Sequence, residues 1–466
     1  MLLLTAILMY FAVLAVSYAL PRKLVAAAGT TRRVAQSKGR RTLHAKPSNY
    51  LSMIKMLRAG DMLVLAPGIY GDGKEIPGLP LFDLHGEPDQ PIIVTGPDAG
   101  PRPVFRASAG YNTIRFKNTS YIIVRNVEVD GRQIDVDGVK AQGITHHITL
   151  ENIRIQNQGN DQQTVGISTK GPTWDWIIRG CEIRGSGTGI YLGNPDGDAP
   201  FIHGLIENNL IEDTVGYNIE IKHQLPWPDL FGVPTDPSST IIRHNVFSKA
   251  HRGSVGHMAR PNVLVGHFPL SGPGKENVYV IYDNFFYENP TGEALFQGEG
   301  NIALYNNLFY NSHGDAIHIQ PHNSVPRIVY VFFNTIIVHG DGIVLVGGDT
   351  RYRQIVVANV AFGRMPIQAN DQAQNFVGSW EAAAQYFVRS TGQPGELDLY
   401  PKVPLRSSTP IDIEGFKQFP DSLLDFNGTP RAGYPLGAYE GEGNNPGWMP
   451  TLTLQPSGPS PSAGPL

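Results

Sequence analysis

The amino-acid sequence predicts an all-β fold, a single-stranded right-handed parallel β-helix of about 9–10 rungs with short helical caps. A motif of a β-branched apolar run, an asparagine and a second apolar run recurs along the chain, as in residues 122–127 and 148–153. Its copies lie 23 to 39 residues apart, a period typical of solenoids. The chain also contains 52 Gly, 37 Pro and only 17% charged residues, which favours strands and turns over helices.

Each copy of the motif alternates apolar and polar residues, as a half-buried strand does. The asparagine is expected at a corner between strands, where it tolerates a left-handed backbone and bonds its neighbours. Stacked corners then form a ladder of amides that stabilises the fold and carries no chemistry. The corner residues of this series are Asn126, Asn152, Gly180, Asn209, Asn245, Asn284, Asn307, Asn334 and Asn359.

Both ends of the predicted coil have features of caps, which a solenoid needs. Residues 50–58 have helical spacing, and residues 380–388 are compatible with a short helix. The β-helix with its caps is predicted to span residues 45–443. Residues 444–466 are rich in Pro, Ser and Gly and are predicted to form a disordered tail.

Residues 1–20 carry no charged side chain and are almost wholly apolar, with a small-residue pattern at Ser17-Tyr18-Ala19. This predicts a cleaved signal peptide, and therefore a secreted, periplasmic or cell-surface protein. Seven basic residues follow within residues 21–44, and this basic linker also fits an uncleaved membrane anchor. A misassigned start is a third interpretation.

Charge and cysteine content exclude two classes of protein. Residues 1–41 contain seven of the 37 basic side chains and no acidic one, so the rest of the chain has 30 basic and 41 acidic side chains. A body with a net charge of −11 is not expected to bind nucleic acid. The single cysteine, Cys181, excludes an internal disulfide framework, and we expect it as a small buried side chain.

Two intervals in the asparagine series, 209 to 245 and 245 to 284, are about ten residues too long, so each must contain a loop of the kind on which sites are built. The first loop, residues 224–239, holds Trp227 between two prolines, and the second begins near residue 259. Trp227 is predicted either to stack on a sugar ring or to pack on its own scaffold.

Positive charge gathers around these loops, with only two acidic residues in between. On an acidic body this local field attracts an anionic substrate. Two members, Arg243 and Lys249, are expected to be merely solvated. The basic residues and histidines of this stretch are Lys222, His223, Arg243, His244, Lys249, His251, Arg252, His257, Arg260 and His267.

Counting along residues 217–223 places Ile219 and Ile221 inside the coil and Glu220 and Lys222 on its outer surface. Counting on from each later corner, and allowing a bulge in the next rung, stacks further polar side chains on the same face. The predicted row is Glu220, Lys222, His257, Gln297, His318 and Gln320, with Arg260 at its edge.

These residue types suit β-elimination from a uronic acid. A base removes the C5 proton, cations neutralise the neighbouring carboxylate, and an acid assists departure of the 4-oxygen. Lys222 is the predicted base, because nearby positive charge or burial lowers the pKa of a lysine. His257 or Arg260 is the predicted acid, and Arg252 or Arg260 the carboxylate partner. The predicted substrate-binding residues are Glu220, Arg252, Trp227, Gln297, His318 and Gln320.

Three segments carry a resemblance to a known family, residues 58–70 (RAGDMLVLAPGIY), 90–94 (QPIIV) and 314–321 (GDAIHIQP). With them the chain resembles polysaccharide lyase family six, the chondroitinase B and alginate lyase group. The resemblance implies a pectate-lyase-like solenoid and a carbon–oxygen lyase that cleaves an acidic, uronic-acid-containing polysaccharide. It also implies a catalytic lysine in the rung where Lys222 stands.

The chain departs from that family at two points. The family's catalytic arginine lies in a Phe-Arg-His-Gly motif, where residues 256–260 here read GHMAR. The family's calcium-binding acids precede its lysine as a spaced pair, whereas here only Glu220 lies that near, and at a different spacing. The resemblance therefore leaves Ca²⁺ open as a cofactor, and no metal ligand is assigned.

Other functions remain open at this stage. A β-helix glycoside hydrolase needs paired carboxylates, and the only close pair on a loop, Asp196 and Asp198, is interpreted as part of a turn. A uronate epimerase also begins with removal of the C5 proton. A non-catalytic glycan-binding or surface β-helix is the alternative of a different class, since fold alone does not establish catalysis. A monomer is expected; the polymer, endo or exo action and metal dependence stay undecided.

Overall fold

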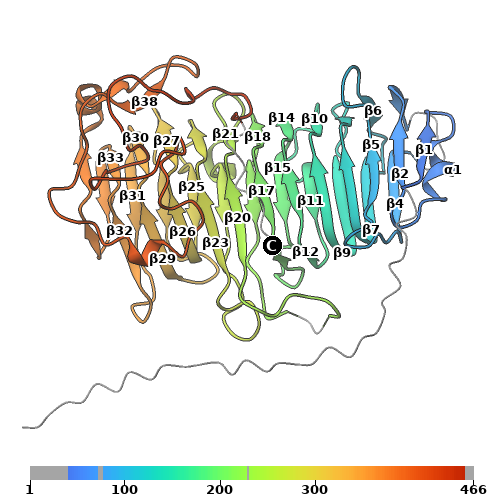
Figure 1. Ribbon diagram of the computed structural model, residues 1–466, viewed down its shortest axis with the longest axis horizontal. Helices are drawn as coiled ribbons and strands as arrows, with labels where there is room; N and C mark the ends of the chain where they lie inside the picture. The colour runs from blue at the N-terminus through green and yellow to red at the C-terminus, as the bar shows by residue number, and fades with distance from the viewer. Residues whose placement is uncertain (1–39, 72–76, 228–229, 457–466) are drawn as a thin grey trace, which may run out of the picture. The chain divides into compact units, whose positions relative to one another are not determined.

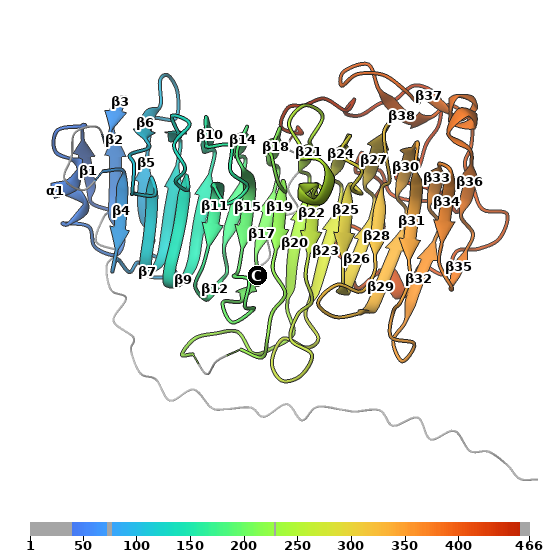
Figure 2. The ribbon, with the colours of Figure 1, turned by 180° about the vertical axis from the view of Figure 1, so that it is seen from behind.

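The computed structural model describes residues 40–71, 77–227 and 230–456, which wind into a parallel β-helix (Figures 1 and 2). The predicted signal peptide or anchor and most of the basic linker lie outside the described residues. The end of that linker is ordered, because Thr42–Ala45 forms β1, which pairs with β2 (Met62–Leu65). In the part of the chain that the structure describes, no helix is long and apolar enough to cross a membrane.

Each full turn of the coil contributes strands to three faces. Face one, seen in Figure 2, begins with β4 (Leu79–Phe82) and ends with β34 (Met365–Gln368). Its strands between these are β11 (Val165–Thr169), β15 (Thr188–Leu192), β19 (Ile219–Ile221), β22 (Val263–Val265), β25 (Phe296–Gly298), β28 (Ile317–Ile319) and β31 (Asp341–Leu345), together with the first halves of β7 (Ile114–Arg125) and β9 (Val139–Glu151).

Face two continues from β1 and β2, and the second halves of β7 and β9 belong to it. These two long strands run through a corner and join faces one and two into one 24-stranded sheet. The remaining strands of face two and its corner are β5 (Ile92–Thr95), β12 (Thr173–Trp174), β13 (Ile177–Arg179), β16 (Phe201–Ile202), β17 (Leu205–Glu207), β20 (Ser239–Arg243), β23 (Val278–Tyr282), β26 (Gly300–Tyr305), β29 (Pro326–Phe332), β32 (Gln354–Val357) and β35 (Gln372–Ala373).

Face three is a separate sheet, and the described residues form 12 parallel strands of it. This exceeds the predicted 9–10 rungs, because β3 and β6 precede the first asparagine corner of the series and β36 follows the last. The strands are β3 (Gly68–Tyr70), β6 (Pro103–Arg106), β8 (Glu128–Asp130), β10 (Arg154–Gln156), β14 (Glu182–Arg184), β18 (Leu210–Glu212), β21 (Val246–Ser248), β24 (Phe285–Tyr287), β27 (Leu308–Asn311), β30 (Thr335–Val338), β33 (Val360–Phe362) and β36 (Phe376–Gly378).

Both ends of the coil are covered by short helical elements. At the start, α1 (Tyr50–Ile54) buries Tyr50, whose ring meets those of Tyr70 and Phe105 edge-on. At the end, residues 380–388 form a 3₁₀ helix, η2 (Trp380–Gln385), followed by β37 (Phe387–Arg389). That strand pairs antiparallel with β38 (Asp398–Pro401). The predicted caps are present, each shorter than its spacing suggested.

The corner motif divides into two adjacent positions with different tasks. The left-handed backbone, with φ between 51° and 61°, falls on a position that any of several residue types fills: Asn126, Asn152, Gly180, Asn208, His244, Asp283, Asn306, Phe333, Ala358 and Gln374. The next position carries the ladder, which consists of Asn209, Asn245, Asn284, Asn307, Asn334, Asn359 and Asn375. The predicted series therefore mixed the two positions, since its first two asparagines belong to the left-handed set.

Each ladder asparagine satisfies several buried groups at once. Asn284 donates through Nδ2 to the carbonyls of Ile242 and Tyr282, both at 2.9 Å, and to Oδ1 of Asn307 at 3.0 Å. Its own Oδ1 accepts the backbone N–H and the side-chain amide of Asn245, both at 2.9 Å. Because the ladder residues repeat this pattern inside a buried corner, the amides hold successive turns in register.

Replacing a ladder residue should therefore destabilise the coil. We expect Asn284→Ala to lower the free energy of unfolding by about 3 kcal/mol or more, because it leaves several buried backbone and amide groups unpaired. Chemical unfolding followed by circular dichroism measures the change. Asn323→Ala, at an exposed position, is the control and should leave stability within about 0.5 kcal/mol. Equal stability of the two variants would contradict a structural role for the ladder.

The chain after β36 folds back over the outside of faces two and three, as the orange and red segments of Figure 1 show. The outward side chains there are aromatic: Tyr282 stacks on Tyr305 at 4.9 Å, and Tyr305 on Phe332 at 4.7 Å between ring centroids. Phe416 of η3 (Glu414–Phe416) stacks on Phe332 at 4.1 Å. A second apolar core, outside the coil, results from this covering segment.

Part of the predicted disordered tail belongs to this cover. The ring of Trp448 contacts those of Phe285 and Phe426, and the Gln455 amide donates to the carbonyls of Asn245 and Asp283. Residues 444–456 are thus packed against the coil. The remainder of the predicted tail, residues 457–466, lies outside the described residues.

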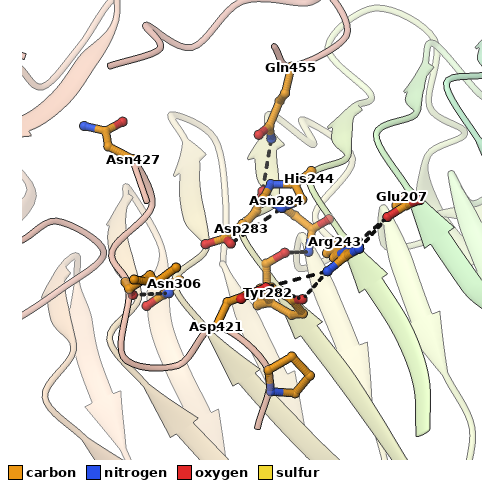
Figure 3. Close-up of polar contacts among 12 residues, drawn as sticks. Glu207, Arg243, His244, Tyr282, Asp283, Asn284, Asn306, Asp421, Asn427 and Gln455 are labelled. Atoms are coloured by element: carbon orange, nitrogen blue, oxygen red, sulfur yellow. Dashed lines mark hydrogen bonds and ion pairs between the residues drawn. The ribbon is translucent and has the colours of Figure 1, made fainter. Parts of the chain in front are cut away.

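A buried polar network fixes the covering segment to face two (Figure 3). Arg243 donates through Nε and Nη2 to Oε2 of Glu207, at 3.0 and 2.8 Å, and through Nη1 to the hydroxyl of Tyr282 at 2.8 Å. Tyr282 in turn donates to Oδ2 of Asp421 at 3.0 Å. Arg243 was expected to be solvated; it is paired and largely buried because the covering segment lies over it. Face one carries no such cover in Figure 2.

Candidate functional site

A pocket of about 220 Å³ opens on face one over β11, β15 and β19. It contains three of the residues that the sequence pattern selects, Glu220, Lys222 and Arg260. The complete lining is Gln162, Gln163, Val165, Lys170, Thr188, Tyr191, Pro195, Tyr217, Glu220, Lys222 and Arg260.

Lys222 and Glu220 face outward as predicted. Ile219 and Ile221 are buried in the core, so the alternation of β19 turns Glu220 to the other side and Lys222 follows the strand end. Nζ of Lys222 lies 2.9 Å from Oε1 of Glu220, and the two side chains are 20% and 7% exposed. This partly buried ion pair forms one wall of the pocket.

A second lysine faces Lys222 across a glycine. Thr169, Leu192 and Ile221 occupy equivalent positions in three consecutive strands, because Ser168 pairs with Tyr191 and Leu192 pairs with Ile221. Continuing this register by one residue places Lys170, Gly193 and Lys222 in one row. A Cβ atom at Gly193 would lie 3.2 Å from Cβ of Lys222, so glycine leaves the space between the two lysines open.

Lys170 lies against an aromatic ring of the pocket. Its Nζ lies 3.6 Å from the centre of the Tyr191 ring, and the described residues provide no carboxylate partner within ion-pair distance. Burial, reinforced by the charges of Lys140 and Lys222, lowers the pKa of Lys170 to about 8. The lysine is therefore partly neutral near physiological pH, which suits a proton acceptor.

Two tyrosines complete the polar lining. Burial raises the pKa of both the Tyr191 and the Tyr217 hydroxyls, and the charge of Glu220 adds to the shift. Both hydroxyls therefore stay protonated and can donate a proton or a hydrogen bond to a bound ligand. The sequence analysis did not select Lys170, Tyr191 or Tyr217. Lys170 lies 18 residues beyond its corner at Asn152, whereas Lys222 lies 14 beyond Asn208, so counting from corners did not align them.

Arg260 enters the pocket on the loop that precedes β22. Its Nη1 donates to the carbonyls of His257 at 3.0 Å and Ala259 at 2.6 Å, and its guanidinium lies 6.0 Å from the Tyr217 ring centre. The Arg260 carbonyl accepts the Lys249 ammonium at 2.5 Å and the Asn289 amide at 2.9 Å. The loop is thus anchored from below by two fully buried side chains.

Lys249 was expected to be solvated, and the structure corrects this. Its side chain is covered by the loop of residues 250–262, and burial lowers its pKa to about 7, with the charge of Arg260 acting in the same direction. The loop therefore holds Lys249 in place through the hydrogen bond from its ammonium to the Arg260 carbonyl.

The sequence pattern predicts that His257 and Arg252 lie at the same site as Lys222. In the structure, neither residue lines the pocket. His257 lies in the exposed 3₁₀ turn η1 (Gly256–Met258), because the strand of that rung is β22 and Leu264 occupies the position next to Glu220. Arg252 points elsewhere: its guanidinium donates to the Gly185 carbonyl and to the Asn160 side chain.

Besides Lys222, three residues of the predicted row lie in register on face one: Glu220, Gln297 and His318. Only Glu220 of these three lines the pocket. Glu220, Leu264, Gln297 and His318 pair in register on successive strands. Gln297 bonds Glu293 at 2.5 Å, and His318 lies 3.2 Å from Asp315, so neighbouring carboxylates hold both side chains. Gln320 follows β28, and neither it nor these two residues line the pocket.

Trp227 packs on its own scaffold, the second of its two predicted roles. Its Nε1 donates to Oε1 of Gln224 at 3.2 Å, and its ring lies so close to Gly274 that a Cβ atom there would meet the ring at 2.3 Å. Trp227 thus joins the two long loops, and it does not line the pocket.

The pocket does not suit a calcium ion. Glu220 is the only carboxylate in its lining and is already paired with Lys222, whereas Ca²⁺ takes six to eight oxygen ligands. Across the described ranges, no group of three or more His, Cys, Asp or Glu side chains is arranged to hold a metal ion.

Comparisons with known proteins identify the fold. Residues 165–362 match a family model described as a right handed beta helix region. The chain is a right-handed parallel β-helix. No curated protein matches the sequence.

Solved structures agree at low identity. A lacto-N-biosidase of glycoside hydrolase family 136 from Eubacterium ramulus is 12% identical, with a TM-score of 0.50 over 73% of this chain and 68% of that one. A pectate lyase is 12% identical, with a TM-score of 0.44 over 86% and 96%. A family-six polysaccharide lyase from Pseudopedobacter saltans is 15% identical, with a TM-score of 0.36 over 74% and 94%. At 12% identity, the likeness to the lacto-N-biosidase is one of fold.

The buried Lys249 predicts a dependence of stability on pH. Its folded pKa of about 7 lies below the ordinary value of 10.5, so between these two pH values the unfolded chain binds a proton that the folded chain has released. Its contribution therefore makes the free energy of unfolding rise with pH in this window, by up to about 1.4 kcal/mol per pH unit. Urea unfolding at pH 7 and pH 9 measures the change.

Lys249→Met should flatten this rise, and Lys55→Met, at the exposed C-cap position after α1, is the matched control. An unchanged slope in Lys249→Met would show that the lysine is not enclosed as described.

Proposed function

We propose that the protein cleaves a uronic-acid-containing polysaccharide by β-elimination in the face-one pocket. The observation that carries the proposal is the convergence of Lys170, Lys222 and Arg260 with two protonated tyrosines in one pocket on face one. Three cations and one carboxylate suit an anionic sugar, and a lysine near neutrality suits the removal of a carbon-bound proton.

The elimination has three requirements, and the pocket supplies a group for each. Arg260 and Lys222 neutralise the uronate carboxylate and so stabilise the negative charge that develops when the C5 proton leaves. A lysine amine takes that proton, and the C–H electron pair forms the double bond between C4 and C5. The bond from C4 to the 4-oxygen breaks, and a tyrosine hydroxyl or the newly protonated lysine gives that oxygen a proton.

The two lysines differ in how well they suit the role of base. The sequence pattern predicts Lys222, but its ammonium already lies 2.9 Å from the Glu220 carboxylate. Lys170 has no such partner, and its pKa of about 8 lies close to working pH. We therefore assign the base to Lys170 and carboxylate binding to Lys222 and Arg260.

Substitution separates these roles. Lys170→Ala should lower kcat by about 10²-fold or more, because it removes the general base. Lys222→Ala should mainly raise KM, because it removes a contact to the substrate carboxylate. Ultraviolet absorbance of the unsaturated product, with alginate, pectate, glucuronan and chondroitin or dermatan sulfate as substrates, measures both.

Lys117→Ala, an exposed lysine on the same face, is the control and should retain full activity. For the wild type, kcat/KM should rise as pH increases through about 8, since the amine must lose its proton to act as base. If Lys222→Ala lowered kcat and Lys170→Ala did not, Lys222 would be the base.

Hydrolysis is the second candidate, favoured by the similarity in fold to a glycoside hydrolase. It needs two carboxylates, and Glu220 is the only one in the lining. Asp196, beside the lining residue Pro195, contributes to the raised pKa of Tyr191 and is the nearest further candidate. New reducing ends without unsaturated product would support hydrolysis. Retained binding with neither signal would indicate a non-catalytic glycan-binding protein.

An extracellular polysaccharide requires an exported enzyme. We propose that residues 1–20 direct export and that the protein works in the periplasm, at the cell surface or outside the cell. N-terminal sequencing of the mature protein distinguishes cleavage from retention as a membrane anchor.

A further inference from the structure

A second pocket, of about 500 Å³, lies at the corner between faces one and two, several turns from the first. The long loop between β22 and β23 forms one wall, and the starts of β26 and β29 form the other. Neither the sequence motifs nor the proposed cleavage makes use of it. Its lining is Leu270, Ser271, Gly272, Lys275, Glu276, Asn301, Arg327, Ile328 and Tyr352.

Arg327 is a cation held in place without a carboxylate. Its Nη2 donates to the Tyr352 hydroxyl, its guanidinium carbon lies 4.4 Å from the centre of that ring, and Nη1 lies 3.5 Å from the Lys275 carbonyl. Within the described residues no carboxylate lies within ion-pair distance of Arg327. The neighbouring Arg351, by contrast, is paired with Asp349 at 2.6 Å. A pre-oriented guanidinium of this kind suits an external carboxylate or sulfate.

Lys275 adds a second positive charge on the opposite wall. Its Nζ lies 3.9 Å from Glu276, and both side chains are more than half exposed, so the pair is loose. Apolar surface lines the same pocket, because Leu270 is 51% exposed and Ile328 is also part of the lining. Cations beside apolar surface match a charged sugar, whose ring has an apolar face and whose substituent is anionic.

The wall that carries Lys275 is braced from outside. Trp227 packs against Gly274, which adopts a left-handed backbone with φ of 82°, so any side chain at this position would collide with the indole. The tryptophan first considered as a sugar-stacking group thus shapes the loop that forms the second pocket.

We propose that this second pocket binds an anionic sugar residue of an acidic polysaccharide, away from the site of cleavage. The substrate class rests on the proposed function, but the binding itself needs no catalysis. Two turns separate β19 from β25, which leads into β26, and three separate it from β28, which leads into β29, so the second pocket lies about 10–15 Å from β19 along the axis. A long polysaccharide is able to engage both pockets, whereas a disaccharide occupies them separately.

Isothermal titration calorimetry with galacturonate and mannuronate disaccharides tests the proposal, with the full chain carrying Lys170→Ala so that the sugar stays intact. Adding Arg327→Ala should remove one binding site or weaken it at least tenfold. Arg389→Ala is the matched control, because it removes the same charge from an exposed ion pair with Glu396 outside the lining, and it should bind as the parent does. A neutral disaccharide should not bind at this site.

The outcomes separate this proposal from the proposed function. If neither acidic disaccharide binds, or if Arg327→Ala binds within twofold of its parent, the second pocket is not a sugar site, whatever the cleavage assay gives. If Arg327→Ala loses binding while wild-type protein forms no unsaturated product, the second pocket stands and the lyase assignment falls. With active enzyme, Arg327→Ala should raise KM for long polymer and leave kcat unchanged.

Discussion

The asparagine ladder is the constraint on which the rest of the molecule depends. A buried amide that donates three hydrogen bonds and accepts two satisfies groups from three successive turns, so each turn is held in register with the next. Register matters because a slip by one residue would exchange the inner and outer side chains of a strand. The outward position of Lys222 follows from that alternation.

The covering segment decides which face is left for function. In the later turns, many outward side chains of faces two and three are aromatic, and residues 390–456 help to bury them in a second core. Network residues such as Arg243 and Asp421 then fix the cover in place. Face one lacks this cover, and its outward positions hold lysine, glutamate and tyrosine. The same coil thus has structural faces and one face that suits a ligand.

The loops supply what the strands alone do not. Arg260 reaches the first pocket only because the loop before β22 bends back over face one, with Lys249 and Asn289 holding its backbone. The loop between β22 and β23 forms the wall of the second pocket, braced by Trp227. Both candidate sites therefore depend on insertions in two successive turns of the coil.

Sequence by itself determined the solenoid, its direction of winding, the burial of Cys181 and the sidedness of β19, because period and alternation are local properties of the chain. It also selected Lys222, Glu220 and Arg260. Only the tertiary structure shows that Lys170, Tyr191 and Tyr217 line the same pocket and that His257 and Arg252 do not. Turns differ in length, so an offset counted from a corner does not fix where a side chain meets the next turn. That meeting is set by register between strands, which is a property of the folded coil.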